Sequence, residues 1–227
     1  MNSIKHILIS FSFLLLYSCG GSLVPSTPTK EMKQQFESKY AYTVLLADMD
    51  LKNDQFKHKY TIIDIDSTHT VTSRQTDWKN VNDDFFYQHE ANLGMEILSK
   101  SPDKKINNIV SPPGFTNFIG NPNYGVWNEL GTWEFNDKYK GLSKDLEIEN
   151  LPIYKKEYVD FLMKYKYNKP HYGEKTHGDS TKYGTRSHHW FFYRPLFYSR
   201  RMSHRNFSKP RSFFNTSGNR GGGGFGK

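Results

Sequence analysis

The residues whose types and spacing best suit chemistry are two pairs of aspartates and a nearby histidine. Asp48 and Asp50 form one Asp-x-Asp pair, and Asp64 and Asp66 form a second. Residues i and i+2 of a strand share a face, so each pair could offer two carboxylates to a divalent cation. With His69 close by in the sequence, the pattern supports one hypothesis, a metal-dependent hydrolase. The alternative, which we favour, is that strand ends at a sheet edge carry acidic residues without any catalytic role.

Other catalytic patterns are incomplete in this sequence. His89-Glu90 lacks the second histidine of a zinc protease helix, and Gly173-Glu174-Lys175-Thr176 lacks the glycine lead-in of a phosphate-binding loop. No Gly-x-Ser-x-Gly occurs. The other histidines that we considered lack a paired i, i+4 helical spacing, namely His58, His171, His177, His188, His189 and His204. We therefore assign no catalytic residue, metal ligand or cofactor, and we expect a protein that is not an enzyme.

Alternating apolar residues predict a β-hairpin early in the folded part of the chain. Tyr42, Val44 and Leu46 alternate with polar or small residues, and a second alternating run covers Phe56–Asp66. The short polar segment between the two runs predicts the turn. The β-branched stretch His69–Arg74 predicts a third, exposed strand.

Helices and a second hairpin complete the predicted elements. Apolar spacing and a stop at Gly94 predict a helix over Val81–Glu90, and a short helix is predicted from Lys30 with Thr29 as its N-cap. A longer helix is predicted between Pro152 and Tyr167, with apolar positions Tyr154, Tyr158, Phe161, Leu162 and Tyr165. Residues 95–100 and 105–110 flank a turn and predict a second hairpin. The fold class is therefore α+β, with a small, mostly antiparallel sheet and one or two helices.

The stretch from Phe115 to Tyr139 follows neither the helical nor the strand period. Aromatic residues are spaced there by asparagine, glycine and proline, which is typical of an ordered loop packed over a core. A recognition surface is the competing interpretation. We favour packing, because large exposed aromatic patches are uncommon in soluble monomers.

The positive charge of this chain belongs to its C-terminal part. The whole sequence carries a net charge of +8, yet residues 180–227 hold ten basic residues and no Asp or Glu. This segment is also rich in glycine and aromatic residues and poor in aliphatic ones, which favours disorder. The residues expected to contact polyanions are Arg186, Arg194, Arg200, Arg201, Arg205, Lys209, Arg211 and Arg220.

The N-terminal segment resembles the export signal of bacterial lipoproteins. Basic residues Lys5 and His6 precede an apolar run from Ile7 to Tyr17, which is too short to span a bilayer as a helix. Leu16, Ser18 and Cys19 are similar to a lipobox, and the chain has no other cysteine. The resemblance covers this signal only, and it implies that the thiol of Cys19 carries a diacylglycerol lipid anchor. Ordinary secretory cleavage just before Cys19, or an uncleaved anchor, is the alternative.

Four segments follow from these observations. We expect a signal peptide over residues 1–18, a flexible tether over 19–29, an α+β domain over 30–168 with an aromatic loop region at about 112–140, and a disordered basic tail over 169–227. The resemblance implies a cell-envelope location, and Gly20 after the cysteine favours the outer membrane.

The expected function is binding rather than catalysis. The basic tail is expected to contact anionic lipid, lipopolysaccharide or wall polymer at the membrane that holds the lipid anchor. We expect no nucleic acid partner, although an Arg-Gly-Gly ending would suit RNA if the chain were not exported. The sequence does not indicate an oligomeric state.

Overall fold

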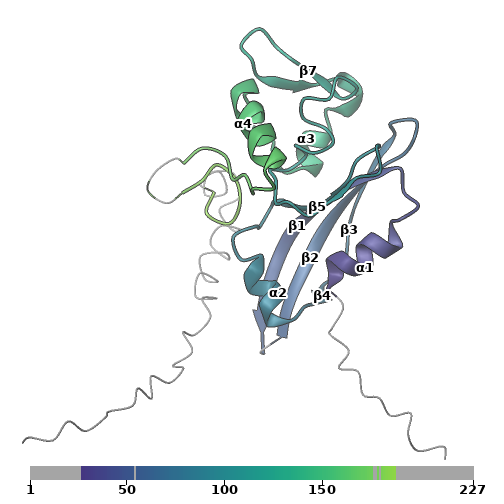
Figure 1. The fold of residues 1–227 in the computed structure, drawn as a ribbon, viewed down its shortest axis with the longest axis vertical. Helices are drawn as coiled ribbons and strands as arrows, with labels where there is room; N and C mark the ends of the chain where they lie inside the picture. The colour runs from purple at the N-terminus through teal and green to yellow at the C-terminus, as the bar shows by residue number, and fades with distance from the viewer. Residues whose placement is uncertain (1–26, 54, 176–177, 179, 188–227) are drawn as a thin grey trace, which may run out of the picture.

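A computed structural model describes residues 27–53, 55–175, 178 and 180–187 of the 227-residue chain. Its centre is a six-stranded sheet with helices and loops on both sides (Figure 1). All pairings between named strands are antiparallel. The predicted α+β class with a mostly antiparallel sheet is therefore confirmed.

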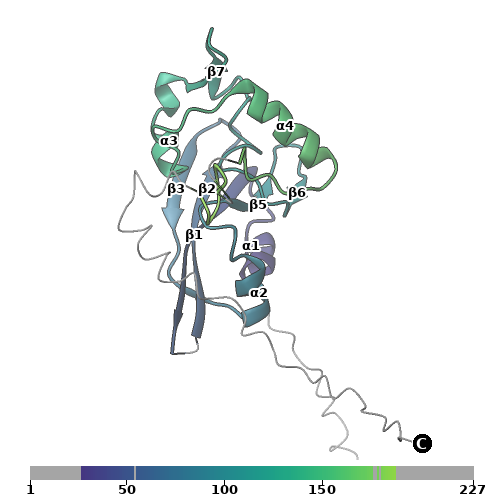
Figure 2. The ribbon, with the colours of Figure 1, turned by 90° about the vertical axis from the view of Figure 1, so that its left-hand side faces the viewer.

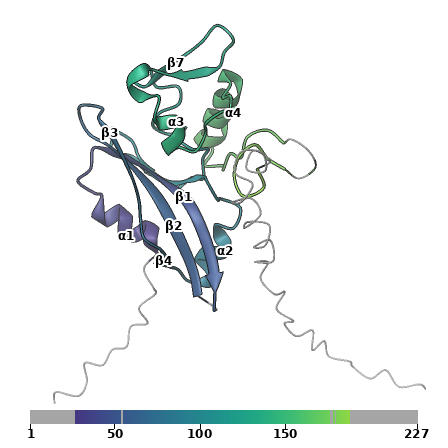
Figure 3. The ribbon, with the colours of Figure 1, turned by 180° about the vertical axis from the view of Figure 1, so that it is seen from behind.

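The long hairpin predicted from the alternating pattern forms the middle of the sheet. β1 (Ala41–Lys52) and β2 (Gln55–Ile65) pair along their whole length and extend below the other strands (Figure 3). A register shift between Leu46 and Asp48 marks a β-bulge. Residues 41–47 are all buried, because alternate side chains enter two different cores on the two faces.

The remaining strands flank this hairpin in the order β3-β2-β1-β5-β6, with β4 also paired to β2. They are β3 (Val71–Gln75), β4 (Lys79–Asn80), β5 (Glu96–Lys100) and β6 (Ile106–Asn107). β3 confirms the predicted exposed third strand, and β5 with β6 confirms the second hairpin, although β6 is only two residues long.

One face of the sheet is covered by α1 (Pro28–Gln35) and α2 (Asp83–Gln88). Its core includes Met32, Phe36, Tyr42, Val44, Leu46, Tyr60, Ile62 and Phe86. α1 begins earlier than the sequence predicted, because Pro28 occupies the first turn and Thr27, not Thr29, is the N-cap.

α2 is shorter than its prediction at both ends. The side chain of Asn82 accepts a hydrogen bond from the Phe85 backbone N–H at 2.7 Å and fixes the first turn. His89 is the C-cap, so the helix ends before Gly94, which instead adopts a left-handed conformation (φ 76°) ahead of β5.

The opposite face is covered by the aromatic region and by two helices, α3 (Leu142–Asp145) and α4 (Lys155–Lys166). Within the aromatic region lie β7 (Gly125–Trp127), β8 (Trp133–Phe135) and a 3-10 turn at Asp137–Tyr139. The packing interpretation is confirmed for most of its rings, because Phe115, Phe118, Tyr124, Trp133 and Tyr139 are buried in this core. The β7–β8 hairpin was not predicted, since three-residue strands leave too little alternation to read.

The boundary predicted at residue 169 is too early. The chain after α4 folds back over the sheet, and it buries His171, Tyr183 and Ser187. The Tyr183 ring contacts Phe115 with their centroids 5.7 Å apart, and Tyr172 packs against the same core, so aromatic rings supply the apolar area that the aliphatic-poor segment lacks. The rest of the predicted tail, from residue 188, and the predicted signal peptide lie outside the described residues. In the part of the chain that the structure describes, none of the helices combines the length and apolar character needed to cross a bilayer.

Candidate functional site

The two aspartate pairs of the hydrolase hypothesis lie at opposite ends of the β1–β2 hairpin. In the strand register Asp64 faces Tyr42, whereas Asp50 faces Lys57. Asp50 lies eight positions after Tyr42 along β1, which corresponds to about 26 Å in an extended strand. The structure therefore does not bring the four carboxylates together.

Asp64 and Asp66 have structural partners. The Asp64 carboxylate forms ion pairs with two basic side chains. Its Oδ2 lies 3.3 Å from Lys39 Nζ and 3.1 Å from Arg74 Nη1. Asp66 Oδ1 accepts hydrogen bonds from the Thr68 hydroxyl and from the backbone N–H groups of Thr70 and Thr68. These bonds lower the pKa of Asp66 and close the turn before β3. These acids tie strands and turns together. Across the described ranges, no three His, Cys, Asp or Glu side chains are grouped as ligands of one ion.

Two histidines are buried beside α2 instead of facing a cleft. Tyr60 Oη lies 3.1 Å from His58 Nδ1, and Asn92 Nδ2 lies 2.9 Å from His89 Nδ1. Burial lowers the pKa of His58 to about 3, with the neighbouring His89 adding to the shift, and burial lowers that of His89 to about 4. Both rings are therefore neutral at physiological pH and belong to the packed core.

A buried carboxyl group lies on β5. Glu96 is 1% exposed, and burial raises its pKa to about 7. The hydroxyls of Thr116 and Ser99 lie close enough to oppose this shift, yet neither carboxyl oxygen has a hydrogen bond of normal geometry. Nothing in the sequence pattern had indicated this group, because Glu96 occupies an ordinary strand position.

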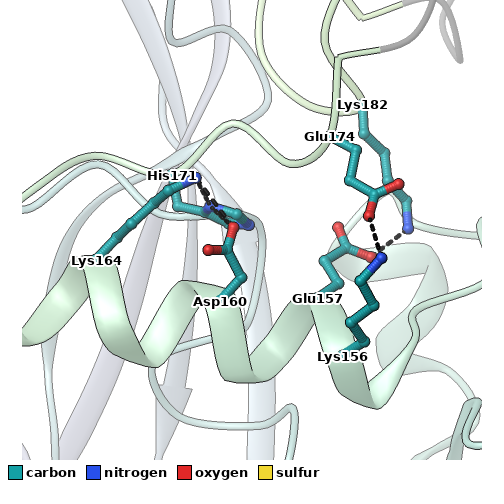
Figure 4. A network of polar contacts seen from close by, with 7 residues as sticks. All are labelled: Lys156, Glu157, Asp160, Lys164, His171, Glu174 and Lys182. Atoms are coloured by element: carbon teal, nitrogen blue, oxygen red, sulfur yellow. Dashed lines mark hydrogen bonds and ion pairs between the residues drawn. The ribbon is translucent and has the colours of Figure 1, made fainter.

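A polar network fixes α4 to the segment that follows it (Figure 4). Glu157 is buried and pairs with Lys182 Nζ at 2.5 Å, and the same ammonium group donates to the backbone oxygen of Pro152. Lys156 reaches Glu174 at 3.3 Å on the exposed side of this pair. Charge pairs thus hold the N-terminal half of α4 against the returning chain.

The second half of the network surrounds His171. Its Nδ1 lies 3.1 Å from Lys164 Nζ and 3.5 Å from Asp160 Oδ2 (Figure 4). Burial lowers the pKa of His171 to about 4, and the Lys164 charge adds to this effect. The imidazole is 1% exposed, so it positions α4 and cannot reach a substrate in solution.

Glu157 is held inward, and α4 presents an apolar stripe outward. Val159, Leu162 and Met163 recur at helical spacing and are exposed, with 54% of Met163 accessible. Exposed Lys155 and Lys166 lie on the same side of the helix. Tyr158, Phe161 and Tyr165 pack inward, as predicted, but Leu162 and Tyr154 were expected on that inward face and are exposed.

The β7–β8 hairpin lies next to the start of α4. Backbone hydrogen bonds join Trp133 N–H to the Ile153 oxygen and Lys155 N–H to the Gly131 oxygen, each at 2.8 Å. The hairpin exposes Val126 and Leu130, the latter 85% accessible. Among the described residues, seven of the ten exposed large apolar side chains fall between Val126 and Tyr167.

We call the exposed side chains of α4 and this hairpin the α4 face, and it is the candidate binding surface. It is defined by Val126, Leu130, Val159, Leu162, Met163 and Tyr167. The sequence pattern that could have indicated this surface is a helix with apolar residues on two faces. One face packs on the core, and the other has no core to cover. Such a concentration of exposed apolar residues is typical of an interaction surface.

Of the eight residues expected to bind polyanions, Arg186 is described and is exposed. Arg194, Arg200, Arg201, Arg205, Lys209, Arg211 and Arg220 lie outside the described residues, as does Cys19. No family model, curated protein or solved structure significantly matches this chain.

Proposed function

We propose that this chain is a lipid-anchored protein of the bacterial cell envelope that acts by binding and not by catalysis. The lipobox-like sequence ending in Cys19 supports an anchor at that thiol. The single observation that carries the proposal further is the start of the folded body: α1 begins at Pro28, only nine positions after the cysteine. An anchor at Cys19 would therefore hold the sheet and its helices close to the bilayer.

The binding role is supported by the surface chemistry at this location. Basic residues from Arg186 to the end of the chain would face phospholipid headgroups, lipopolysaccharide phosphates or anionic wall polymers, and each lysine or arginine near such a surface adds on the order of 1 kcal/mol. The hydrolase alternative loses support from the separation of Asp48 and Asp50 from Asp64 and Asp66.

Metabolic labelling tests the anchor directly. The full chain should incorporate palmitate and fractionate with membranes, and a Cys19→Ala variant should lose the label. An unlabelled, water-soluble mature protein in the cytosol would refute the proposal and make nucleic acid the leading partner for the basic tail.

A truncation tests the binding role. Removing residues 188–227 leaves the buried Tyr183 and Ser187 in place, so the folded body should be retained. The truncated chain should bind less well to vesicles containing phosphatidylglycerol, and added salt should weaken binding of the full chain. Asp64→Asn is the matched control, because a hydrolase site would make that substitution the damaging one.

A further inference from the structure

We propose that the α4 face rests on the anionic lipid surface of the membrane that holds the anchor, giving the protein a second and reversible membrane contact. This inference rests on the proposed lipidation of Cys19. The lipid anchor by itself would leave the orientation of the folded body free. Contact between the α4 face and anionic headgroups would fix that orientation.

The chemistry of α4 suits an interfacial helix. Val159 and Met163 stand at the centre of its outer side, with Leu162 beside them. Lys155 and Lys166 lie on the same side, where their ammonium groups can reach headgroup phosphates while the apolar side chains enter the acyl boundary. Each lysine near an anionic surface strengthens association by about fivefold.

The inward side of α4 is already occupied, so the helix cannot turn its apolar stripe into the core. Phe161 packs against Phe115 and Tyr165, and Glu157 is paired with Lys182. The stripe is consequently a permanent feature of the surface, and a lipid surface with negative headgroups complements both its apolar centre and its basic flanks.

The tether permits this contact. Eight peptide units join Cys19 to Thr27, so the tether can reach about 28 Å when fully extended. Lys33, in the last turn of α1, and Asn168, just after α4, line the same open groove, so the C-terminal end of α1 lies near that of α4. Figure 2 shows α4 running along one edge of the molecule from the β7–β8 hairpin towards β6, with α1 on the same side.

A protein partner or a second copy of the chain would use the same surface differently. In a symmetric dimer through α4, the lysines at both ends of the stripe would face lysines of the other copy, which disfavours that arrangement. A protein partner would require a receptor in native membranes and would be insensitive to the charge of synthetic lipids.

The test uses the full, processed chain in vesicles. The sequence has one cysteine, whose thiol carries the anchor, so an introduced cysteine is the only site for a thiol-reactive fluorophore. Met163→Cys places an environment-sensitive probe on α4. Ser73→Cys on exposed β3, on the opposite side of the molecule in Figure 2, is the matched control. Vesicles contain phosphatidylcholine with or without phosphatidylglycerol, and brominated lipids serve as quenchers.

The expected result is a blue shift and lipid quenching at position 163 in anionic vesicles, with neither at position 73. Charge reversal by Lys155→Glu with Lys166→Glu should reduce both signals, with an unchanged melting temperature as the check on folding. The inference is overturned if position 163 remains as solvent-exposed as position 73, if both respond equally, or if position 163 is shielded only in native membranes. Flotation in the same samples separates the two proposals: protein that floats without a probe response refutes only the docking, whereas protein that fails to float refutes the anchor.

Discussion

Replacing the buried Glu96 with glutamine should stabilise the protein at alkaline pH and change it little in acid. The side chain lies within β5 and is 1% exposed, and burial raises its pKa from an ordinary value of 4.5 to about 7. In the unfolded chain the same carboxyl returns to water and regains its ordinary pKa. Between pH 4.5 and about pH 7 the folded state therefore keeps a proton on Glu96 that the unfolded state releases.

The sign and the size follow from this difference. The pKa of Glu96 is higher in the folded state than in the unfolded state. Its contribution to the free energy of unfolding is therefore fully present below pH 4.5 and is lost as the pH rises to about 7. Each pH unit of separation corresponds to about 1.4 kcal/mol, so the ionised carboxylate costs roughly 3 kcal/mol above pH 7. Glutamine keeps the shape and hydrogen-bonding capacity of the protonated acid but cannot ionise.

Urea unfolding followed by tryptophan fluorescence measures the effect at pH 5 and pH 8. We expect Glu96→Gln to gain up to about 3 kcal/mol over the natural chain at pH 8 and much less at pH 5. Glu129→Gln, at an exposed position near the hairpin tip, is the control and should change neither value appreciably. An equal effect of Glu96→Gln at both pH values, or a loss of stability at pH 8, would show that the carboxyl is not held neutral by burial.

Three further predictions concern the packing around the α4 face and the buried rings. Lys182→Met should cost about 3–5 kcal/mol in urea unfolding because it leaves Glu157 buried and unpaired, and adding Glu157→Gln should recover part of the loss; no recovery would argue against the ion pair. Gly120→Ala should lower stability by more than about 2 kcal/mol, since its φ is +76° and a Cβ would lie 2.4 Å from the Tyr158 ring, whereas Gly131→Ala, with φ +70° and open space, should cost only about 1 kcal/mol. The buried histidines His58, His89 and His171 should make the free energy of unfolding fall as the pH drops below 6.5, because the unfolded chain takes up protons there that the folded chain binds only near pH 3–4. Urea unfolding across pH 4–7 measures this change, and a flat profile would contradict the buried, neutral state of the three rings.

The candidate surface shows where sequence reasoning stopped. The helical spacing of Tyr158, Phe161 and Tyr165 correctly predicted α4 and its inward face. The same pattern placed Leu162 with them, because 3.6-residue periodicity cannot separate the border of a buried face from that of an exposed one. Only the packed neighbours of the helix show that Leu162 joins Val159 and Met163 on the outside.

The expected grouping of the four aspartates was wrong for a related reason. The spacing of Asp64 and Asp66 and of Asp48 and Asp50 was compatible with paired carboxylates on a strand. Whether two pairs meet depends on strand register. The turn near Asn53 places Asp64 opposite Tyr42, at the end of β1 far from Asp48 and Asp50. Register is set by the turn and by the buried faces together, so the spacing of acids within the chain carries no information about it.

The sequence by itself determined the elements whose cause is local. Alternation along Tyr42–Leu46 specified the central hairpin, helical spacing specified α4, and a lone cysteine after an apolar run supports a proposed anchor. Tertiary structure decided what depends on contacts between distant residues: the burial of Glu96, the packing of His171, Tyr183 and Ser187 against the rest of the fold, and the side of α4 that remains outside. Local patterns record the backbone preference of each segment, whereas exposure and pKa are fixed by which segments cover one another.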